Sequence, residues 1–160
     1  MIDVKIKFLN EDAKMPYKKH ETDFCYDLYA TTDAMPVYDE DGNLIERVIK
    51  YGTGISLEID RENDEGLIED ALLCFDARPR SSIYKTGLSL CNSVGTIDED
   101  YRGEVYLYFY NIIPELPNYK KGERIAQLTL NGSEKINFLT SDKLSETERN
   151  EGGFGHTGLR

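Results

Sequence analysis

The sequence predicts an all-β domain, a β-barrel or a jelly-roll-like sandwich of short strands. Apolar and polar residues alternate with a period of two in several short segments, most clearly at residues 4–8 and 105–111. Glycine, proline and asparagine separate these segments, and convincing helical periodicity is nearly absent. At 160 residues the chain is long enough for one domain with a real core and short for two.

The expected strands follow one another along most of the chain. In residues 4–8, three apolar side chains alternate with lysines. Asp41-Gly42 lies between short apolar runs and predicts a hairpin over residues 37–45. Residues 67–75 would suit a helix as well as a strand, and we predict a strand there. The other expected strands are 22–32, 53–59, 88–92, 105–111, 123–130 and 135–139.

Composition and charge exclude several classes of function. Hydrophobic residues make up 39% of the chain and charged residues 31%, and no run of roughly twenty apolar residues could span a bilayer. The formal net charge of −11 opposes nonspecific binding to nucleic acid and to anionic membranes. We therefore expect a soluble protein with no nucleic-acid or membrane partner. Any phosphate ligand would need local arginine donors and a divalent cation.

Two features bear on the cellular compartment. Residues 1–5 lack a basic segment followed by an apolar one, so we expect no secretory signal and a cytoplasmic location. Cys25, Cys74 and Cys91 are odd in number and widely spaced, which argues against a disulfide framework and a zinc site. We expect three reduced, partly buried thiols.

The stretch Gly95 to Glu104 concentrates three carboxylates and a tyrosine between two glycines. The strand-like segments 88–91 and 105–111 flank it, so we predict a hairpin with a carboxylate-rich tip. A carboxylate that a rigid hairpin holds beside a bound anion suits a general base, and Asp98 is the candidate. The alternative is that Asp98 and its acidic neighbours form a solvated turn.

Three other stretches carry polar groups of interest. Residues 78–82 place arginines beside two hydroxyls and exposed backbone N–H groups, which suits a phosphate clamp. Residues 122–128 form a turn that enters a strand, where Arg124 suits a surface or structural salt bridge. From Ser141 onward the chain is polar and then glycine-rich, typical either of a disordered tail or of an arm that folds over a ligand.

Together and in this order, five pieces of the chain resemble the motifs of the trimeric dUTP pyrophosphatases, the dUTPases. The similarity spans roughly residues 22 to 158 and so covers most of the chain. The five pieces are Tyr26-Asp27-Leu28-Tyr29-Ala30, Pro79-Arg80-Ser81-Ser82, Gly95 to Gly103, Gly122 to Leu128, and the glycine-rich stretch Arg149 to Gly158.

This resemblance implies a jelly-roll-like domain at residues 1–140 and a mobile C-terminal arm at 141–160 that closes over the active site. It also implies a homotrimer with active sites at subunit interfaces, and hydrolysis of dUTP to dUMP and pyrophosphate with Mg²⁺. Asp98 would deprotonate the attacking water. The substrate's phosphates would chiefly hold the metal, with Asp27 acting through its water shell.

The resemblance also implies a set of substrate contacts. Tyr101 would lie against the deoxyribose and exclude a 2′-hydroxyl, while Asn92 would read the uracil edge with backbone groups of the hairpin. The remaining implied contacts are the hairpin positions Gly95 and Ile97, the phosphate-contacting Arg80, Ser81, Ser82 and Gln127, and the arm residues Arg149, Phe154, Gly155 and Thr157.

Three residues depart from the family pattern. Ser82 and Asn150 stand where many members have glycine. His156 stands where members usually have a serine, whose small hydroxyl group would face the γ-phosphate. Asn tolerates a positive φ angle, so the change at 150 is mild.

Two other functions compete with dUTP hydrolysis. A dCTP deaminase of related fold would need a catalytic glutamate where this chain has Tyr108. A tyrosine side chain cannot serve as the proton shuttle at neutral pH, because free tyrosine ionises only near pH ~10. The second is a dUTP-responsive regulatory binding protein, for which the acidic region 61–76 could form a partner surface instead of a solvated loop and strand.

Overall fold

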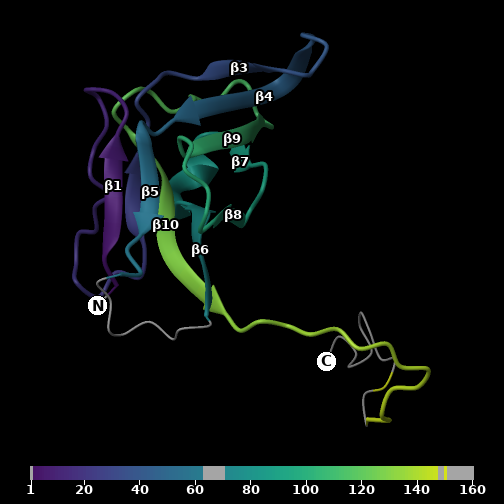
Figure 1. Ribbon diagram of the computed structural model, residues 1–160. Helices are drawn as coiled ribbons and strands as arrows, with labels where there is room; N and C mark the ends of the chain where they lie inside the picture. Colours follow the sequence, from purple (N-terminus) through teal and green to yellow (C-terminus); the bar gives the residue numbers. More distant parts are fainter. Residues whose placement is uncertain (1, 63–70, 148–149, 151–160) are drawn as a thin grey trace.

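The computed structural model describes residues 2–62, 71–147 and 150, and the described chain is built almost entirely from strands (Figure 1). The strands are β1 (Val4–Phe8), β2 (Tyr26–Tyr29), β3 (Met35–Tyr38), β4 (Leu44–Gly52), β5 (Ile55–Ile59), β6 (Leu72–Pro79), β7 (Leu88–Leu90), β8 (Gly95–Asp98), β9 (Tyr106–Asn111) and β10 (Arg124–Ser133). One 3₁₀ helix, η1 (Ser81–Lys85), follows β6. Within the described residues, no helix is both long and apolar enough to cross a membrane.

The strands form three antiparallel sheets. One sheet has the order β2-β10-β6-β8, a second has the order β3-β4-β9-β7, and β1 pairs with β5 in a third. Residues from all three sheets meet in one hydrophobic core, whose largest fully buried side chains are Tyr51, Phe109, Leu28, Ile55 and Ile125. This arrangement is an open, jelly-roll-like sandwich, as the period-two patterns predict.

Three aromatic rings form the centre of the core. The ring centroids of Tyr51 and Phe109 lie 5.8 Å apart, and Tyr119 contacts both rings edge to face. The Tyr51 hydroxyl donates a hydrogen bond to the backbone oxygen of Tyr119 at 3.1 Å, and burial raises the pKa of Tyr51 to about 12. These contacts fix the chain just before β10, where part of the candidate site begins.

Most of the expected strands are present. The hairpin predicted over residues 37–45 is confirmed, with Tyr38 paired to Leu44 and Gly42 at a φ angle of 83° in the turn. The strand predicted at 67–75 is confirmed from Leu72 onward as β6, and residues 67–70 lie outside the described part of the chain. The three cysteines are free and partly buried, as predicted.

The simple hairpin predicted around the acidic stretch is incomplete. Strands β7 and β9 do pair, with Leu90 opposite Phe109. Between them, however, the chain crosses to the other four-stranded sheet, where β8 pairs with β6 and Ile97 lies opposite Phe75. Part of the expected tip is therefore an edge strand, and only residues 99–105 form the connecting loop.

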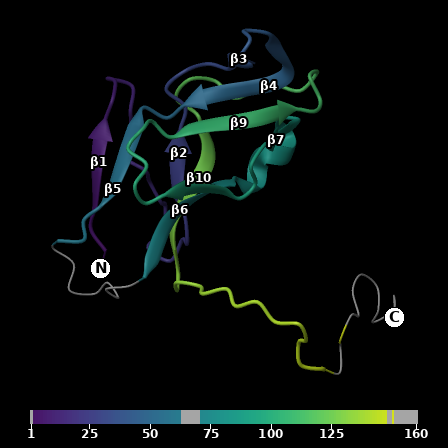
Figure 2. The ribbon, with the colours of Figure 1, turned by 45° about the vertical axis from the view of Figure 1, so that its right-hand side comes forward.

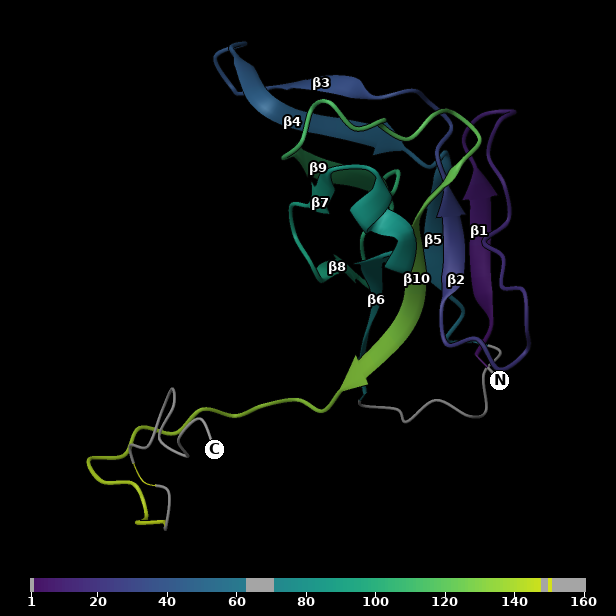
Figure 3. The same cartoon turned by 180° about the vertical axis from the view of Figure 1, so that it is seen from behind.

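The strand predicted at 135–139 is wrong for the single chain. Strand β10 ends at Ser133, and the segment that follows runs away from the sheets in all three views (Figures 1, 2 and 3). Ile136 and Phe138 are 71% and 88% exposed. Because this segment leaves the body, its backbone groups pair with no strand among the described residues, although its side chains alternate as in a strand.

Candidate active site

The acidic loop and its flanking strands enclose a cavity of about 260 Å³. Three of the residues predicted to contact base, water and sugar lie in its wall: Asn92, Asp98 and Tyr101. We call these three residues the hairpin half-site. The remaining wall is Thr96, Ile97, Glu104, Val105, Tyr106 and Tyr108.

Two glycines leave room for the side chains of Asn92 and Tyr101. A Cβ atom at Gly95 would lie 2.9 Å from the Nδ2 atom of Asn92. One at Gly103 would lie 2.4 Å from the Tyr101 hydroxyl oxygen, so the ring of Tyr101 lies directly over this glycine. The Tyr101 hydroxyl donates to the backbone oxygen of Glu104 at 2.9 Å. A side chain at either glycine would therefore displace a predicted substrate contact.

Asp98 ends strand β8 and lies between two cavities. Besides the cavity of the hairpin half-site, its side chain lines a second hollow of about 730 Å³ together with Glu99, Asp100 and Arg102. The backbone oxygen of Asp98 accepts a hydrogen bond from the backbone N–H of Tyr101 at 3.1 Å. The side chain is exposed, so water and substrate can reach this carboxylate.

An ion pair fixes the loop next to Asp98. Arg61 donates through Nε and Nη2 to the two carboxylate oxygens of Glu99, the second at 2.6 Å, and Nη2 also reaches the backbone oxygen of Ala71 at 2.8 Å. These hydrogen bonds hold the pKa of Glu99 below its usual value, and burial opposes them. Glu99 is thus a structural carboxylate, which leaves its neighbour Asp98 available.

A second group of predicted residues surrounds the buried carboxylate of Asp27 on β2. Arg80 donates to its Oδ1 atom at 2.9 Å, Arg124 donates to Oδ2 at 2.9 Å, and Gln127 donates to Oδ1 at 3.3 Å. We call these four residues the cationic half-site. The prediction that Arg124 forms a structural salt bridge is confirmed.

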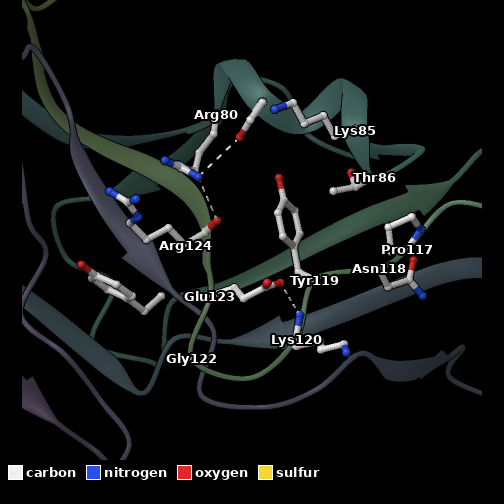
Figure 4. A pocket seen from close by; sticks show the side chains of 12 residues that line it. Arg80, Lys85, Thr86, Pro117, Asn118, Tyr119, Lys120, Gly122, Glu123 and Arg124 are labelled. Atoms are coloured by element: carbon white, nitrogen blue, oxygen red, sulfur yellow. Dashed lines mark hydrogen bonds between the residues drawn. The ribbon is translucent and has the colours of Figure 1, made fainter.

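The cationic half-site opens into a cavity of about 470 Å³ that Figure 4 shows. Four cations and one carboxylate line it: Arg80, Lys85, Lys120, Arg124 and Glu123. Arg80 Nη1 also donates to the Ser82 hydroxyl and to the backbone oxygen of Arg124, both at 3.4 Å. The predicted Ser81 begins helix η1 beside them. Such an excess of cations suits a phosphate-bearing ligand.

The donor set around Asp27 decides what kind of metal contact it can make. Its carboxylate accepts three N–H groups, so little of its lone-pair capacity is left for a direct metal bond. In the described part of the chain, no group of three acidic, histidine or cysteine side chains could hold a metal ion. These residues therefore fit Mg²⁺ only as partners of its water shell, with direct ligands from a substrate.

The two half-sites lie far apart in one chain. Asp98 pairs with Cys74 on β6, whereas Gln127 pairs with Arg78 four residues further along β6 and with Asp27 on its other side. Four residues along a strand span about 13 Å, and three strand spacings separate β8 from β2 by about 14 Å. The α-phosphate of one substrate cannot touch both half-sites of the same chain.

The arm residues predicted to contact substrate, Arg149, Phe154, Gly155 and Thr157, lie outside the described residues. Asn150 is described and has a φ angle of 42°, which agrees with the expectation that it tolerates a position common for glycine. The sequence did not indicate the ion pair of Arg61 with Glu99, or the places of Lys85 and Glu104 in the walls of the two cavities. Lys85 and Glu104 lie close in sequence to predicted motifs, but a charged side chain alone does not specify its partner.

The fold is an all-β, jelly-roll-like domain, with an exposed carboxylate in one cavity and clustered cations in another. A carboxylate that can activate water and cations that bind phosphate are the groups that an enzyme hydrolysing a nucleotide phosphate uses. The dUTPase family model matches residues 11–158. The chain belongs to the dUTPase family.

Relatives of known name agree with this assignment. The chain is 36% identical over 156 residues to the deoxyuridine 5′-triphosphate nucleotidohydrolase of Clostridium tetani, covering 97% of this chain and 96% of the relative. It is 34% identical over 161 residues to the protein of the same name from Alkaliphilus metalliredigens, covering 100% of both chains.

Solved structures share the fold. A mutant dUTPase of Staphylococcus bacteriophage 80alpha, solved with dUpNHpp, superposes with a TM-score of 0.69 at 22% identity and covers 98% of this chain and 99% of its own. A mutant dUTPase from phage phi11 of S. aureus, described with a structural Mg(II) ion, gives a TM-score of 0.64 at 16% identity, covering 90% of this chain and 99% of its own.

Proposed function

We propose that this chain hydrolyses dUTP to dUMP and pyrophosphate, which limits uracil entry into DNA and supplies dUMP for dTMP synthesis. One observation carries the proposal: in a chain of the dUTPase family, the three residues predicted to read the base, activate water and face the sugar line a single cavity. Family membership favours this activity over the deaminase alternative, whose catalytic glutamate position holds Tyr108.

Asp98 acts as the general base. Its exposed carboxylate accepts a proton from a water molecule as the water oxygen attacks the α-phosphorus, and pyrophosphate leaves on the opposite side. Asn92 orients the uracil, and the Tyr101 ring fills the space that a 2′-hydroxyl would need. No covalent intermediate with the protein is required.

The cationic half-site binds the phosphates, with Arg80, Ser82 and Gln127 as donors and Ser81 at the start of η1. Mg²⁺, held chiefly by the phosphates, would offset the negative charge that develops during attack. Asp27 would contact the metal only through water, because its oxygens already accept three N–H groups.

The working unit is a homotrimer in which each active site combines half-sites from different subunits. The distance between the half-sites within one chain supports this, because one substrate must contact both. The exposed Ile136, Phe138 and Leu139 also support it, since apolar side chains on an extended segment fit packing against another copy. The arm residues Arg149, Phe154, Gly155 and Thr157 would then close over the bound nucleotide.

The activity is tested by pyrophosphate release with dUTP, dCTP, dTTP and UTP in the presence of Mg²⁺. Turnover of dUTP well above the other three is expected. Ammonia release from dCTP would instead support the deaminase, and binding of dUTP without turnover would support the regulatory alternative.

The shared site is tested by mixing two inactive variants, Asp98→Asn and Arg80→Ala. If each site takes its half-sites from different subunits, random mixed trimers at equal proportion restore about a quarter of the sites. Co-refolding the two variants, followed by sizing and the pyrophosphate assay, measures this. Activity no higher than the sum of the separate variants would show that one chain supplies both half-sites.

A further inference from the structure

The loop that carries Tyr101 is fastened to the body of the protein by Glu104. The Oε1 atom of Glu104 accepts the backbone N–H of Gly54 at 2.8 Å, in the turn between β4 and β5. The backbone oxygen of the same residue accepts the Tyr101 hydroxyl at 2.9 Å. Glu104 therefore joins the tyrosine ring to a turn that is distant in sequence.

The space around this contact is closely fitted. A Cβ atom at Gly52 would lie 2.5 Å from Glu104 Oε1, so glycine at 52 leaves room for the carboxylate. The Glu104 carboxylate beside the Tyr106 hydroxyl raises the pKa of Tyr106. Glu104 is partly buried in the wall of the cavity that holds Asn92 and Asp98.

We propose that Glu104 is a positioning residue that fixes the Tyr101 ring and thereby sets the selection of deoxyribose over ribose. The inference rests on the proposed function, because it concerns the sugar that the same site accepts. The ring excludes a 2′-hydroxyl only while it stays in place, and one hydroxyl oxygen occupies little space. A small shift of the ring therefore admits the ribonucleotide, whereas Asp98, on the edge strand β8, keeps its place.

Two other hydrogen bonds hold the same loop and provide a matched control. Ser56 Oγ donates to the backbone oxygen of Arg102 at 2.7 Å, and Thr53 Oγ1 donates to that of Val105 at 2.6 Å. Neither bond involves Glu104 or the Tyr101 hydroxyl. Removing the Ser56 hydroxyl thus loosens the loop without releasing the ring.

The experiment measures kcat/KM for dUTP and UTP in Glu104→Gln, Glu104→Ala, Glu104→Asp and Ser56→Ala, with urea unfolding of each. Glutamine keeps the acceptor for the Gly54 N–H, so its dUTP-over-UTP ratio should stay within about threefold of the parent. Alanine removes the acceptor, and aspartate is one methylene too short to reach it. Both should lower the ratio about tenfold, mainly through faster UTP turnover.

Ser56→Ala should lower the urea midpoint and leave the nucleotide ratio unchanged. The proposal is overturned if the aspartate or alanine variant keeps the parent ratio, or if Ser56→Ala lowers the ratio equally. If Glu104→Ala prevents folding, the dUTP-over-UTP ratio of Glu104→Asp still tests the proposal. Failure of the proposed function gives a different result, because the parent protein itself would then not turn over dUTP.

Discussion

The hairpin half-site is held by strand pairing and by several contacts of its loop, whereas the cationic half-site is held together by one carboxylate. Asp98 belongs to a paired strand, and backbone groups and Glu104 fix the loop that follows. In the cationic half-site, Arg80, Arg124 and Gln127 all donate to Asp27. Replacing Asp98 should therefore change the chemistry alone, while replacing Asp27 should change the structure as well.

The largest expected effect is that of Asp98→Asn. The amide can still hydrogen-bond water but cannot accept its proton, so kcat should fall by on the order of 10²–10⁴ while dUTP binding survives. The Asp98 side chain is exposed and forms no ion pair with another residue in the described part of the chain, so the urea midpoint should not change. Retention of more than about a tenth of kcat would remove Asp98 from the role of general base.

Ending the chain after residue 140 should give the next largest loss. The core lies in residues up to β10, so the shortened protein should stay folded and, if the proposed trimer forms, keep that assembly. Activity should nevertheless fall in both kcat and KM, because the arm would no longer close over the nucleotide. Phe154→Ala alone should cost about 1–3 kcal/mol of transition-state binding, the strength of one aromatic–base stack. Near-full activity of the shortened protein would show that the arm is only a tail.

Asp27→Asn tests whether the cationic half-site depends on one carboxylate. Two guanidinium groups lose their counter-charge, so the free energy of unfolding should fall by about 2 kcal/mol. The Mg²⁺ concentration for half-maximal activity should also rise. Urea unfolding and a Mg²⁺ titration measure the two effects, with Asp98→Asn as the structural control. An unchanged unfolding midpoint would show that Asp27 does not hold the cationic half-site together.

Tyr101→Ala should affect specificity more than rate. Without the ring, the space for a 2′-hydroxyl opens, so the dUTP-over-UTP ratio should fall about tenfold or more, with a smaller loss of dUTP turnover. Tyr101→Phe keeps the ring and loses only the hydrogen bond to Glu104, so it should lie between alanine and the parent. An unchanged ratio in the alanine variant would show that another group selects the sugar.

The smallest effect is expected from the Arg61–Glu99 ion pair. Arg61 lowers the pKa of Glu99 from its ordinary value of 4.5, so the pair stabilises the fold above pH 4.5 and this stability is lost as pH falls through the lowered pKa. Since both side chains are partly exposed, Glu99→Gln should cost about 0.5 kcal/mol at pH 7. Unfolding of parent and variant should converge at low pH, and a constant difference down to pH 3 would exclude this origin.

The alternating segments identified strands such as β9, in which buried residues alternate with more exposed ones. The sequence of β5 also alternates, although both of its faces are largely buried in the structure. Strand β8 could not be predicted in the same way. It has only four residues, and it pairs with β6, in a different sheet from its sequence neighbours β7 and β9, so neither length nor local pattern indicates the pairing. At 135–139 the alternation is present, but no strand in the described ranges 2–62 and 71–147 lies beside this segment.

The motif residues of the site were predictable because the five stretches occur in family order. The division of these residues into two half-sites could not be predicted, because the register of β6 with β8 and β10 determines which residues lie together. Glu104 and Arg61 could not be assigned from sequence. Their partners Gly54 and Glu99 lie about 40 to 50 residues away, and nothing in a charged side chain specifies such a distant partner.

The crossing of β8 between the sheets has a consequence for folding. Its neighbours in sequence, β7 and β9, belong to one sheet, whereas its hydrogen-bonding partner belongs to the other. The β7–β9 hairpin can form early from local contacts, but Asp98 reaches its place only when the two sheets have met. During refolding, catalytic activity should therefore return with the last cooperative step, and those amide protons of the edge strand β8 that bond to β6 should exchange only when the two sheets separate.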